Sequence, residues 1–254
     1  FLNGKKPIQH RSSYGLGEVI KAALDNHTEH LVISLGGIGS FDGGAGMLQA
    51  LGATFYDDEA QIVDMRKGAY LIKYIRRIDL SGVHPQLTKV NIQLMSDFSS
   101  RLYGKKSEIM QTYESLDLSQ NEAAEIDNLI WYFSELFKNE LKIAMGPIER
   151  GGAGGGIAAV LNSLYQAEIL TSHELVNQIT HLENLIQQAD LIIFGEGLKE
   201  EDQILETTTI RIAELTQQYN KPAIAICATN DKFDLFESLN VTAMFNTFID
   251  MPDS

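Results

Sequence analysis

The chain contains 254 residues, of which 44% are hydrophobic and 21% charged, so it is long enough for one large domain or two ordinary ones and can bury a core without cross-links. Its formal net charge of −14 disfavours nucleic acid and anionic membrane surfaces as partners, and no apolar run approaches the roughly 20 residues that span a bilayer. Cys227 is the single cysteine, which excludes a disulfide framework and fits a reducing compartment such as the cytoplasm.

A helix, a strand, a glycine-rich loop and a second helix are expected in that order near the start of the chain. Residues 14–26 carry apolar positions at helical spacing, namely Leu16, Val19, Ile20 and Ala23. The apolar run 31–35 predicts a strand, and residues 44–52 predict the helix that follows the loop. The loop between them carries Gly36, Gly37, Gly43 and Gly44 around a single acid, Asp42.

The middle of the chain predicts one strand and one long helix. Residues 90–94 alternate apolar and polar side chains, which is typical of a half-buried strand, and this strand runs into Asp97. Ser119 and Glu122 have the spacing of a capping box, so we expect the helix to begin there. Trp131 and Phe137 lie in this helix and are expected to pack in the core.

The second half of the chain alternates helices with apolar strands. A second glycine loop, 151–156, precedes the helical run 157–165, and Thr171 with Glu174 forms another capping box. Continuous apolar runs then predict buried strands at 191–194, 223–226 and 241–245. Helical stretches between such strands indicate a parallel sheet covered on both faces, and therefore an α/β fold.

The two glycine loops are candidate anion sites. Glycine lets a ligand approach the backbone, and a loop that opens a helix exposes unpaired N–H groups at the positive end of the helix dipole. The alternative is that the glycines only form tight turns. Asp42 could cap the following helix, act as a base or hold a metal. No G-x-x-x-x-G-K-[ST] or G-x-G-x-x-G pattern occurs, which disfavours an ordinary P-loop or a dinucleotide-dependent enzyme.

Two further carboxylates follow predicted strands. Asp97 ends the strand at 90–94, and Glu196 lies between Gly195 and Gly197 just after the strand at 191–194. Ligands of open α/β sheets bind at the carboxyl ends of strands, so both acids are candidate site residues. The alternative for each is a solvated carboxylate in a turn.

Five segments, in this order, resemble those of the bacterial glycerate kinase family: SSYGLGEVIKAALD, GG…DGGAGMLQALG, GGAGGGIAAVL…AE, ADLIIFGEG and KPAIAI. The resemblance implies a two-domain α/β fold, with a Rossmann- or flavodoxin-like parallel sheet and a second mixed α/β domain. Residues 1–180 would form the central α/β domain. Residues 181–254 would form the C-terminal part of the Rossmann-like domain. The family's N-terminal segments have no counterpart here, and the start on Phe1 fits a chain that lacks them.

The resemblance also implies an activity, namely transfer of the ATP γ-phosphate to a hydroxyl of glycerate with Mg²⁺. Asp42, Asp97 and Glu196 would be the catalytic residues. The substrate- and nucleotide-binding positions implied in this way are Gly36, Gly37, Gly43, Gly44, Gly152, Gly155, Gly195 and Gly197. The sequence does not identify the ligands of the metal, and the oligomeric state is open, with a homodimer among the options.

The chain departs from the family's pattern in its first two polar segments. The family's first loop has the motif GGSATNDGG, and its Ser and Asn are replaced here by Ile38 and Phe41. In the CDVxNPL segment the Asp is kept as Asp97, while Asn becomes Ser100. The GPQKG segment that should follow is not recognisable within residues 103–118.

The last motif, GEGRxDxQTxxGK, keeps its first three residues, but its Arg and Lys fall at Leu198 and Thr207. Phosphoryl transfer depends on cations that stabilise charge in the transition state, so these losses weaken the expectation of activity. The alternative hypothesis is a catalytically impaired homologue that binds a small acid or a nucleotide as a regulatory protein.

Overall fold

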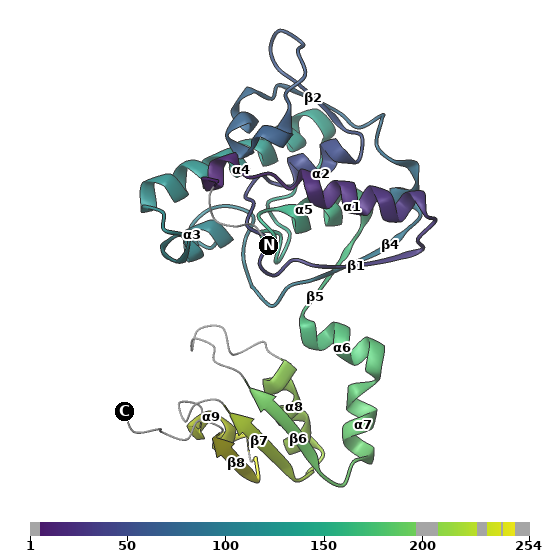
Figure 1. The fold of residues 1–254 in the computed structure, drawn as a ribbon, viewed down its shortest axis with the longest axis vertical. Coiled ribbons are helices and arrows are strands. Elements are labelled where there is room, and N and C mark those ends of the chain that lie inside the picture. The colour runs from purple at the N-terminus through teal and green to yellow at the C-terminus, as the bar shows by residue number, and fades with distance from the viewer. Residues whose placement is uncertain (1–5, 197–207, 228–232, 240, 247–254) are drawn as a thin grey trace, which may run out of the picture. The chain divides into compact units, whose positions relative to one another are not determined.

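The structure is a computed structural model that describes residues 6–196, 208–227, 233–239 and 241–246. The chain divides into two compact units, Phe1–Ile169 and Leu170–Ser254 (Figure 1). The domain boundary expected after residue 180 lies within the second unit. Both units combine helices with parallel strands, and the predicted α/β class is therefore confirmed.

The first unit is built on a short sheet in the order β1-β4-β5. Strands β1 (His30–Ser34) and β4 (Asn91–Met95) are parallel, with Ser34 opposite Met95, and β5 (Glu168–Leu170) completes the sheet. Both predicted strands are thus confirmed. Because β1 and β4 are parallel, the loops that follow them leave from the same edge of the sheet.

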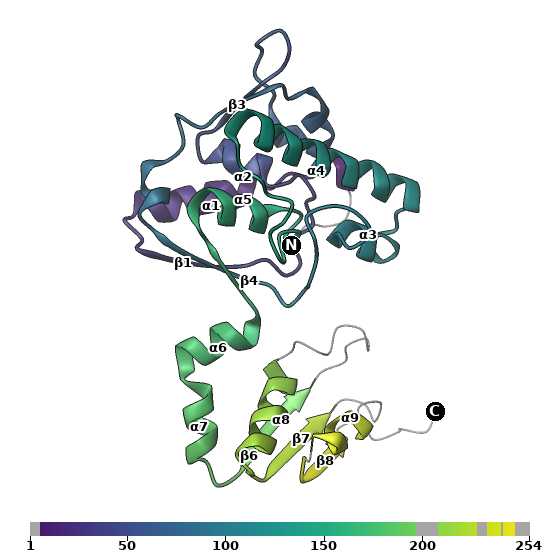
Figure 2. The same ribbon diagram turned by 180° about the vertical axis from the view of Figure 1, so that it is seen from behind.

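Helices α1, α2 and α5 lie on one side of β1 and β4 in both views (Figures 1 and 2). The α-helices of the first unit are α1 (Tyr14–Asp25), α2 (Ala45–Ala50), α3 (Glu108–Thr112), α4 (Gln120–Leu141) and α5 (Ile157–Tyr165). Its 3₁₀ turns are Ile8–His10, Met65–Lys67, Ala69–Tyr74, Pro85–Thr88 and Glu114–Leu116. Two further strands, β2 (Thr54–Tyr56) and β3 (Arg77–Asp79), pair antiparallel.

Helix α4 begins where the sequence predicted, because the capping box of Ser119 and Glu122 is present. Phe137 is buried as expected, but Trp131 is 47% exposed, so the prediction that it packs in the core is wrong. The buried stripe of α4 contains Ile130 and Phe133, and residue 131 lies about 100° round the helix from Ile130. Val19 of α1 is 68% exposed although Ile20 is buried, because the two residues likewise point in different directions around the helix.

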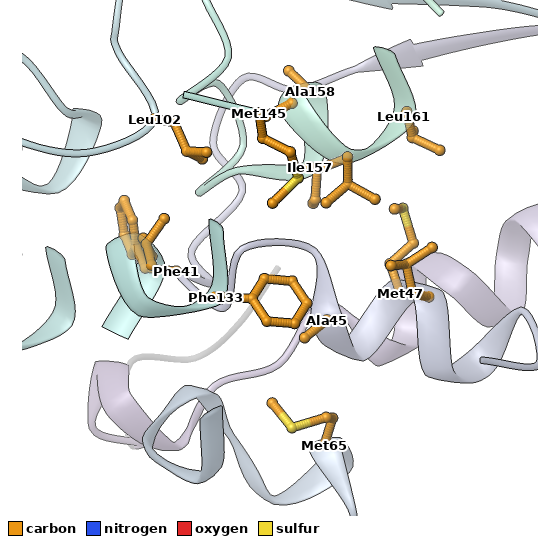
Figure 3. Close-up of a cluster of buried hydrophobic side chains, with 14 of the residues drawn as sticks. Phe41, Ala45, Met47, Met65, Leu102, Phe133, Met145, Ile157, Ala158 and Leu161 are labelled. Atoms are coloured by element: carbon orange, nitrogen blue, oxygen red, sulfur yellow. The ribbon is translucent and has the colours of Figure 1, made fainter. Parts of the chain in front are cut away.

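The core of the first unit lies where α2, α4 and α5 meet. Figure 3 shows Phe133 of α4 among side chains from the other elements, including Met47 of α2 and Ile157 of α5. All three side chains are fully buried. The glycine loops lead directly into α2 and α5, so their backbones are anchored by this core.

The second unit has a parallel sheet in the order β6-β7-β8. Its strands are β6 (Ile192–Glu196), β7 (Ala223–Cys227) and β8 (Ala243–Asn246), as the three apolar runs predicted. Its helices are α6 (Ser172–Thr180), α7 (Leu182–Gln188), α8 (Thr208–Gln218) and α9 (Phe233–Ser238). The capping box of Thr171 and Glu174 is present at the start of α6.

One face of this second sheet packs on its helices, where Phe194, Ala225 and Phe236 are buried. Side chains of the other face are exposed within the described residues, with Ile193 at 61% and Phe245 at 57%. The expectation that both faces are covered therefore does not hold for the part of the chain that the structure describes. Among the described helices, none is both long and apolar enough to cross a membrane.

Candidate functional site

The carboxyl ends of β1 and β4 bring two of the predicted site segments together. The ladder continues past the strands, because the Leu35 amide donates to the Met95 carbonyl at 2.9 Å. Gly36 and Gly37 follow on one side and Asp97 on the other, and all three residues are exposed. This is the edge at which parallel sheets bind ligands.

Asp42, in contrast, is completely buried. Its Oδ2 accepts hydrogen bonds from the Ser13 amide at 2.8 Å, the Ser13 hydroxyl at 2.9 Å and the Gly46 amide at 3.2 Å, and its Oδ1 accepts from the Gly44 amide at 3.1 Å. Burial raises the pKa of Asp42 above its ordinary value, and the hydrogen bonds from Ser13, Gly46 and Gly44 oppose that rise. The carboxylate thereby ties the start of α1 to the start of α2.

This position gives no support to the expectation that Asp42 is a catalytic residue. Its exposed fraction is 0%, and its oxygens are occupied by donors of the protein itself. The surroundings of Asp42 also explain Gly46, where a Cβ would overlap the Ser12 hydroxyl and lie 2.7 Å from Oδ2 of Asp42. Gly46 therefore leaves room for the buried carboxylate.

The inner glycines of the two loops pack against each other. The Gly43 amide donates to the Gly155 carbonyl at 2.9 Å, and the Gly152 amide donates to the Ser100 carbonyl at 3.2 Å. A Cβ on Gly155 would overlap the Ser40 carbonyl oxygen, and its φ of 65° is in the left-handed region. Gly43, Gly44, Gly152 and Gly155 are all buried, with their amides bonded within the protein.

Sequence reasoning missed Glu108, which begins α3 within the unrecognised segment 103–118. Its Oε2 accepts a hydrogen bond from the Gly155 amide at 3.2 Å. Burial raises the pKa of Glu108 to about 7, although the amides of Gly155 and Gly154 oppose the rise. A Cβ on Gly154 would be 3.2 Å from Leu35, so this carboxyl lies on the loop that packs against the end of β1. Its signal in the sequence, an acid in the first turn of a helix, indicates only a helix start.

The remaining candidates belong to the second unit. Gly195 lies in β6, and Glu196 is its last residue, opposite Cys227 in the register with β7. Cys227 is buried. Gly197 and the positions of the missing Arg and Lys, 198 and 207, lie outside the described residues. Within the described part of the chain, no group of three or more His, Cys, Asp or Glu side chains is placed to hold a metal ion.

Comparisons with known proteins identify the family to which this chain belongs. The profile of the Glycerate kinase family matches residues 2–253. The chain is 31% identical over 218 residues to the glycerate kinase of Halalkalibacterium halodurans, covering 86% of this chain and 57% of that protein. It is 29% identical over 236 residues to the glycerate 2-kinase of Escherichia coli, covering 92% of this chain and 61% of that protein.

A solved structure agrees with these relatives. The candidate glycerate kinase 2 of Salmonella typhimurium LT2 superposes with a TM-score of 0.81 at 29% identity, covering 96% of this chain and 63% of that one. The chain thus spans about three fifths of the length of these relatives. The family that the five sequence segments indicated is confirmed, and the chain belongs to the glycerate kinase family.

Proposed function

We propose that this chain is the larger part of an enzyme that transfers the γ-phosphate of ATP to a hydroxyl of glycerate. The observation that carries the proposal is the family match over residues 2–253. The exposed segments at the carboxyl ends of β1 and β4 support it, because they offer backbone amides and a carboxylate at an edge where small ligands bind.

In this proposal Gly36 and Gly37 let the substrate's carboxylate or a phosphate approach the backbone, and Asp97 is one of the catalytic carboxylates of the first unit. Mg²⁺ is often held by one or two carboxylates together with the phosphates of its nucleotide. The exposed carboxylate of Asp97 fits that mode. The metal, when bound, would neutralise charge on the transferred phosphoryl group.

The other predicted residues receive different roles. Asp42, with Gly43, Gly44, Gly152 and Gly155, holds the loops in place and does not contact the substrate. Glu196 and Gly195, with Gly197, remain candidates for the ligand site of the second unit, at the carboxyl end of a parallel strand.

Glu108 is the proposed acceptor of the proton that the substrate hydroxyl loses. A general base works best when its pKa is near the operating pH, and burial raises the pKa of Glu108 to about 7. Its carboxylate lies on the second glycine loop, which packs against the end of β1. In this role Glu108 accepts the proton as the hydroxyl oxygen attacks the γ-phosphorus, while the bond from that phosphorus to the β–γ bridging oxygen breaks and ADP leaves.

The test is ADP release from Mg-ATP with and without D-glycerate, using the full-length protein that contains this chain. We expect glycerate-dependent turnover that falls at least about 100-fold in Asp97→Asn, in line with the loss of one preorganised catalytic group. Asp58→Asn removes another exposed carboxylate of the same unit and is the matched control. A folded protein with no turnover, in an assay where a known glycerate kinase is active, would overturn the proposal.

The hypothesis of an impaired, regulatory homologue receives no support from the comparisons, since the relatives described above are named as kinases. The cytoplasmic location and the homodimer stay predictions. The first rests on the lone cysteine, and the second is open to a measurement of molar mass in solution.

A further inference from the structure

A cavity of about 380 Å³ lies beside the first turn of α1. Three basic side chains line it, those of Lys6, Arg11 and Arg66. Glu18 is the acid in its lining. Such a concentration of positive charge is unusual in a chain with 20 basic and 34 acidic residues. The volume is in the range of small-molecule sites.

Arg66 is oriented by two hydrogen bonds to Asp64. Its Nε and Nη2 donate to the two carboxylate oxygens of Asp64 at 2.7 and 2.9 Å, and its guanidinium lies 5.8 Å from the centre of the Tyr14 ring. Asp64 offsets part of the charge of Arg66. It also restrains the Arg66 side chain, which is 64% exposed, so that less entropy is lost on binding a ligand.

Arg11 is also held by hydrogen bonds. Its Nε donates to the Lys6 carbonyl at 2.9 Å, and its Nη1 donates to the Gly39 carbonyl at 3.3 Å. The side chain of Arg11 therefore connects the cavity to the first glycine loop. A ligand that contacts Arg11 would therefore affect the position of that loop.

The usual structural reasons for a glycine do not apply at Gly15, and this points to a ligand. A Cβ there would meet nothing within 4 Å, and Gly15 is not among the residues with positive φ. Gly17, two residues on, is different, because its Cβ would overlap the Met47 carbonyl. Glycine in a helix costs about 0.5–1 kcal/mol relative to alanine. At Gly15 the absence of a side chain leaves the space beside the first turn of α1 open, and this accounts for the cost.

We propose that this cavity binds the phosphate group of a small molecule. Guanidinium groups that are oriented by hydrogen bonds suit phosphate oxygens, and the first turn of a helix adds a favourable dipole. Ser12 and Tyr14 line the same cavity. The proposal rests on the cavity itself and does not depend on the proposed kinase reaction.

The first test is calorimetric titration of the protein with inorganic phosphate at low ionic strength. Gly15→Glu places a negative charge in the cavity, and Arg66→Gln removes a guanidinium. Ala22→Glu adds the same charge at an exposed position further along α1 and is the matched control. We expect each cavity variant to weaken phosphate binding at least about tenfold, and Ala22→Glu to change it less than about twofold.

Several outcomes would overturn the proposal. They are no phosphate binding by the unaltered protein, equal weakening by Gly15→Glu and Ala22→Glu, or acetate binding as tight as phosphate. If Gly15→Glu does not fold, as judged by circular dichroism, Arg66→Gln carries the comparison. Titration with Mg-ADP then identifies the source of the phosphate. A parallel loss in the cavity variants indicates the nucleotide, and unchanged Mg-ADP binding indicates a separate phosphate compound.

Discussion

The exposed glycines at the end of β1 and the buried glycines of the second loop look alike in the sequence but have opposite surroundings. A Cβ on Gly37 would meet nothing within 4 Å, whereas a Cβ on Gly152 or Gly155 would overlap a carbonyl oxygen of a neighbouring loop. The first kind leaves room for a ligand. The second kind lets two backbones come into contact. A glycine-rich loop is therefore evidence of a binding site only after the space around each glycine is known.

The two aspartates repeat the contrast. Asp42 is buried and accepts hydrogen bonds from Ser13, Gly44 and Gly46, whereas Asp97 is exposed at the strand edge. Asp42 ties the starts of α1 and α2 together inside the unit, whereas Asp97 lies at its surface. The comparison predicts that stability and activity separate between the two groups of residues.

Gly155→Ala should have the largest effect on stability. The new Cβ would overlap the Ser40 carbonyl oxygen, and alanine would be held at a φ of 65°. We expect the free energy of unfolding to fall by more than about 4 kcal/mol, measured by urea denaturation. Gly37→Ala is the control, because it has a similar φ of 71° in open space and should lose only about 1 kcal/mol. Equal losses would mean that the close contact between the loops is not as described.

Asp42→Ala should come second, with a loss of about 3–4 kcal/mol, because it leaves several buried donors without their acceptor. Asp97→Ala should change the free energy of unfolding by less than about 0.5 kcal/mol, as surface substitutions usually do. Both variants are measured by urea denaturation, and folded samples are assayed for turnover. An Asp42→Ala protein that is fully stable but inactive would contradict this structural role and indicate that Asp42 contacts the ligand.

The sequence predicted the elements well because their causes are local. The capping boxes at Ser119 and Thr171 set two helix starts, and alternation or continuous apolar runs marked the strands. The burial of Asp42 could not be predicted, because two of its donors come from Ser13, far away along the chain. Glu108 was missed for the same reason. Its environment is made by Gly154 and Gly155.

Glu108→Gln should have an effect that depends on pH. Burial raises the pKa of Glu108 to about 7 in the folded chain, from an ordinary value of 4.5. Between these values the folded state binds more protons than the unfolded state, so the free energy of unfolding falls as the pH rises from about 4.5 to 7. The glutamine cannot ionise and escapes this loss. We expect the variant to be more stable than the unaltered protein at pH 8 by up to about 3 kcal/mol, with the difference gone near pH 4.5.

The measurement is urea denaturation from pH 4.5 to 8, with Glu140→Gln as an exposed control at the end of α4. The same samples report on catalysis, where Glu108→Gln should lose turnover although it gains stability at pH 8. A variant with unchanged turnover would remove Glu108 from the proposed proton transfer. An unchanged pH profile of stability would contradict its burial as a carboxyl group.

Gly36→Ala should have the smallest effect on stability and is therefore the most direct test of the comparison. Gly36 is not at positive φ, and the nearest atom to its Cβ would be the Ser34 hydroxyl oxygen at 4.0 Å. We expect the free energy of unfolding to change by less than about 0.5 kcal/mol. The methyl group would, however, occupy the space through which a ligand approaches the backbone, so KM for glycerate or for ATP should rise. If both KM values and kcat stay unchanged, the open space beside these glycines does not receive the substrate, and the binding edge has to be sought beyond the end of β1.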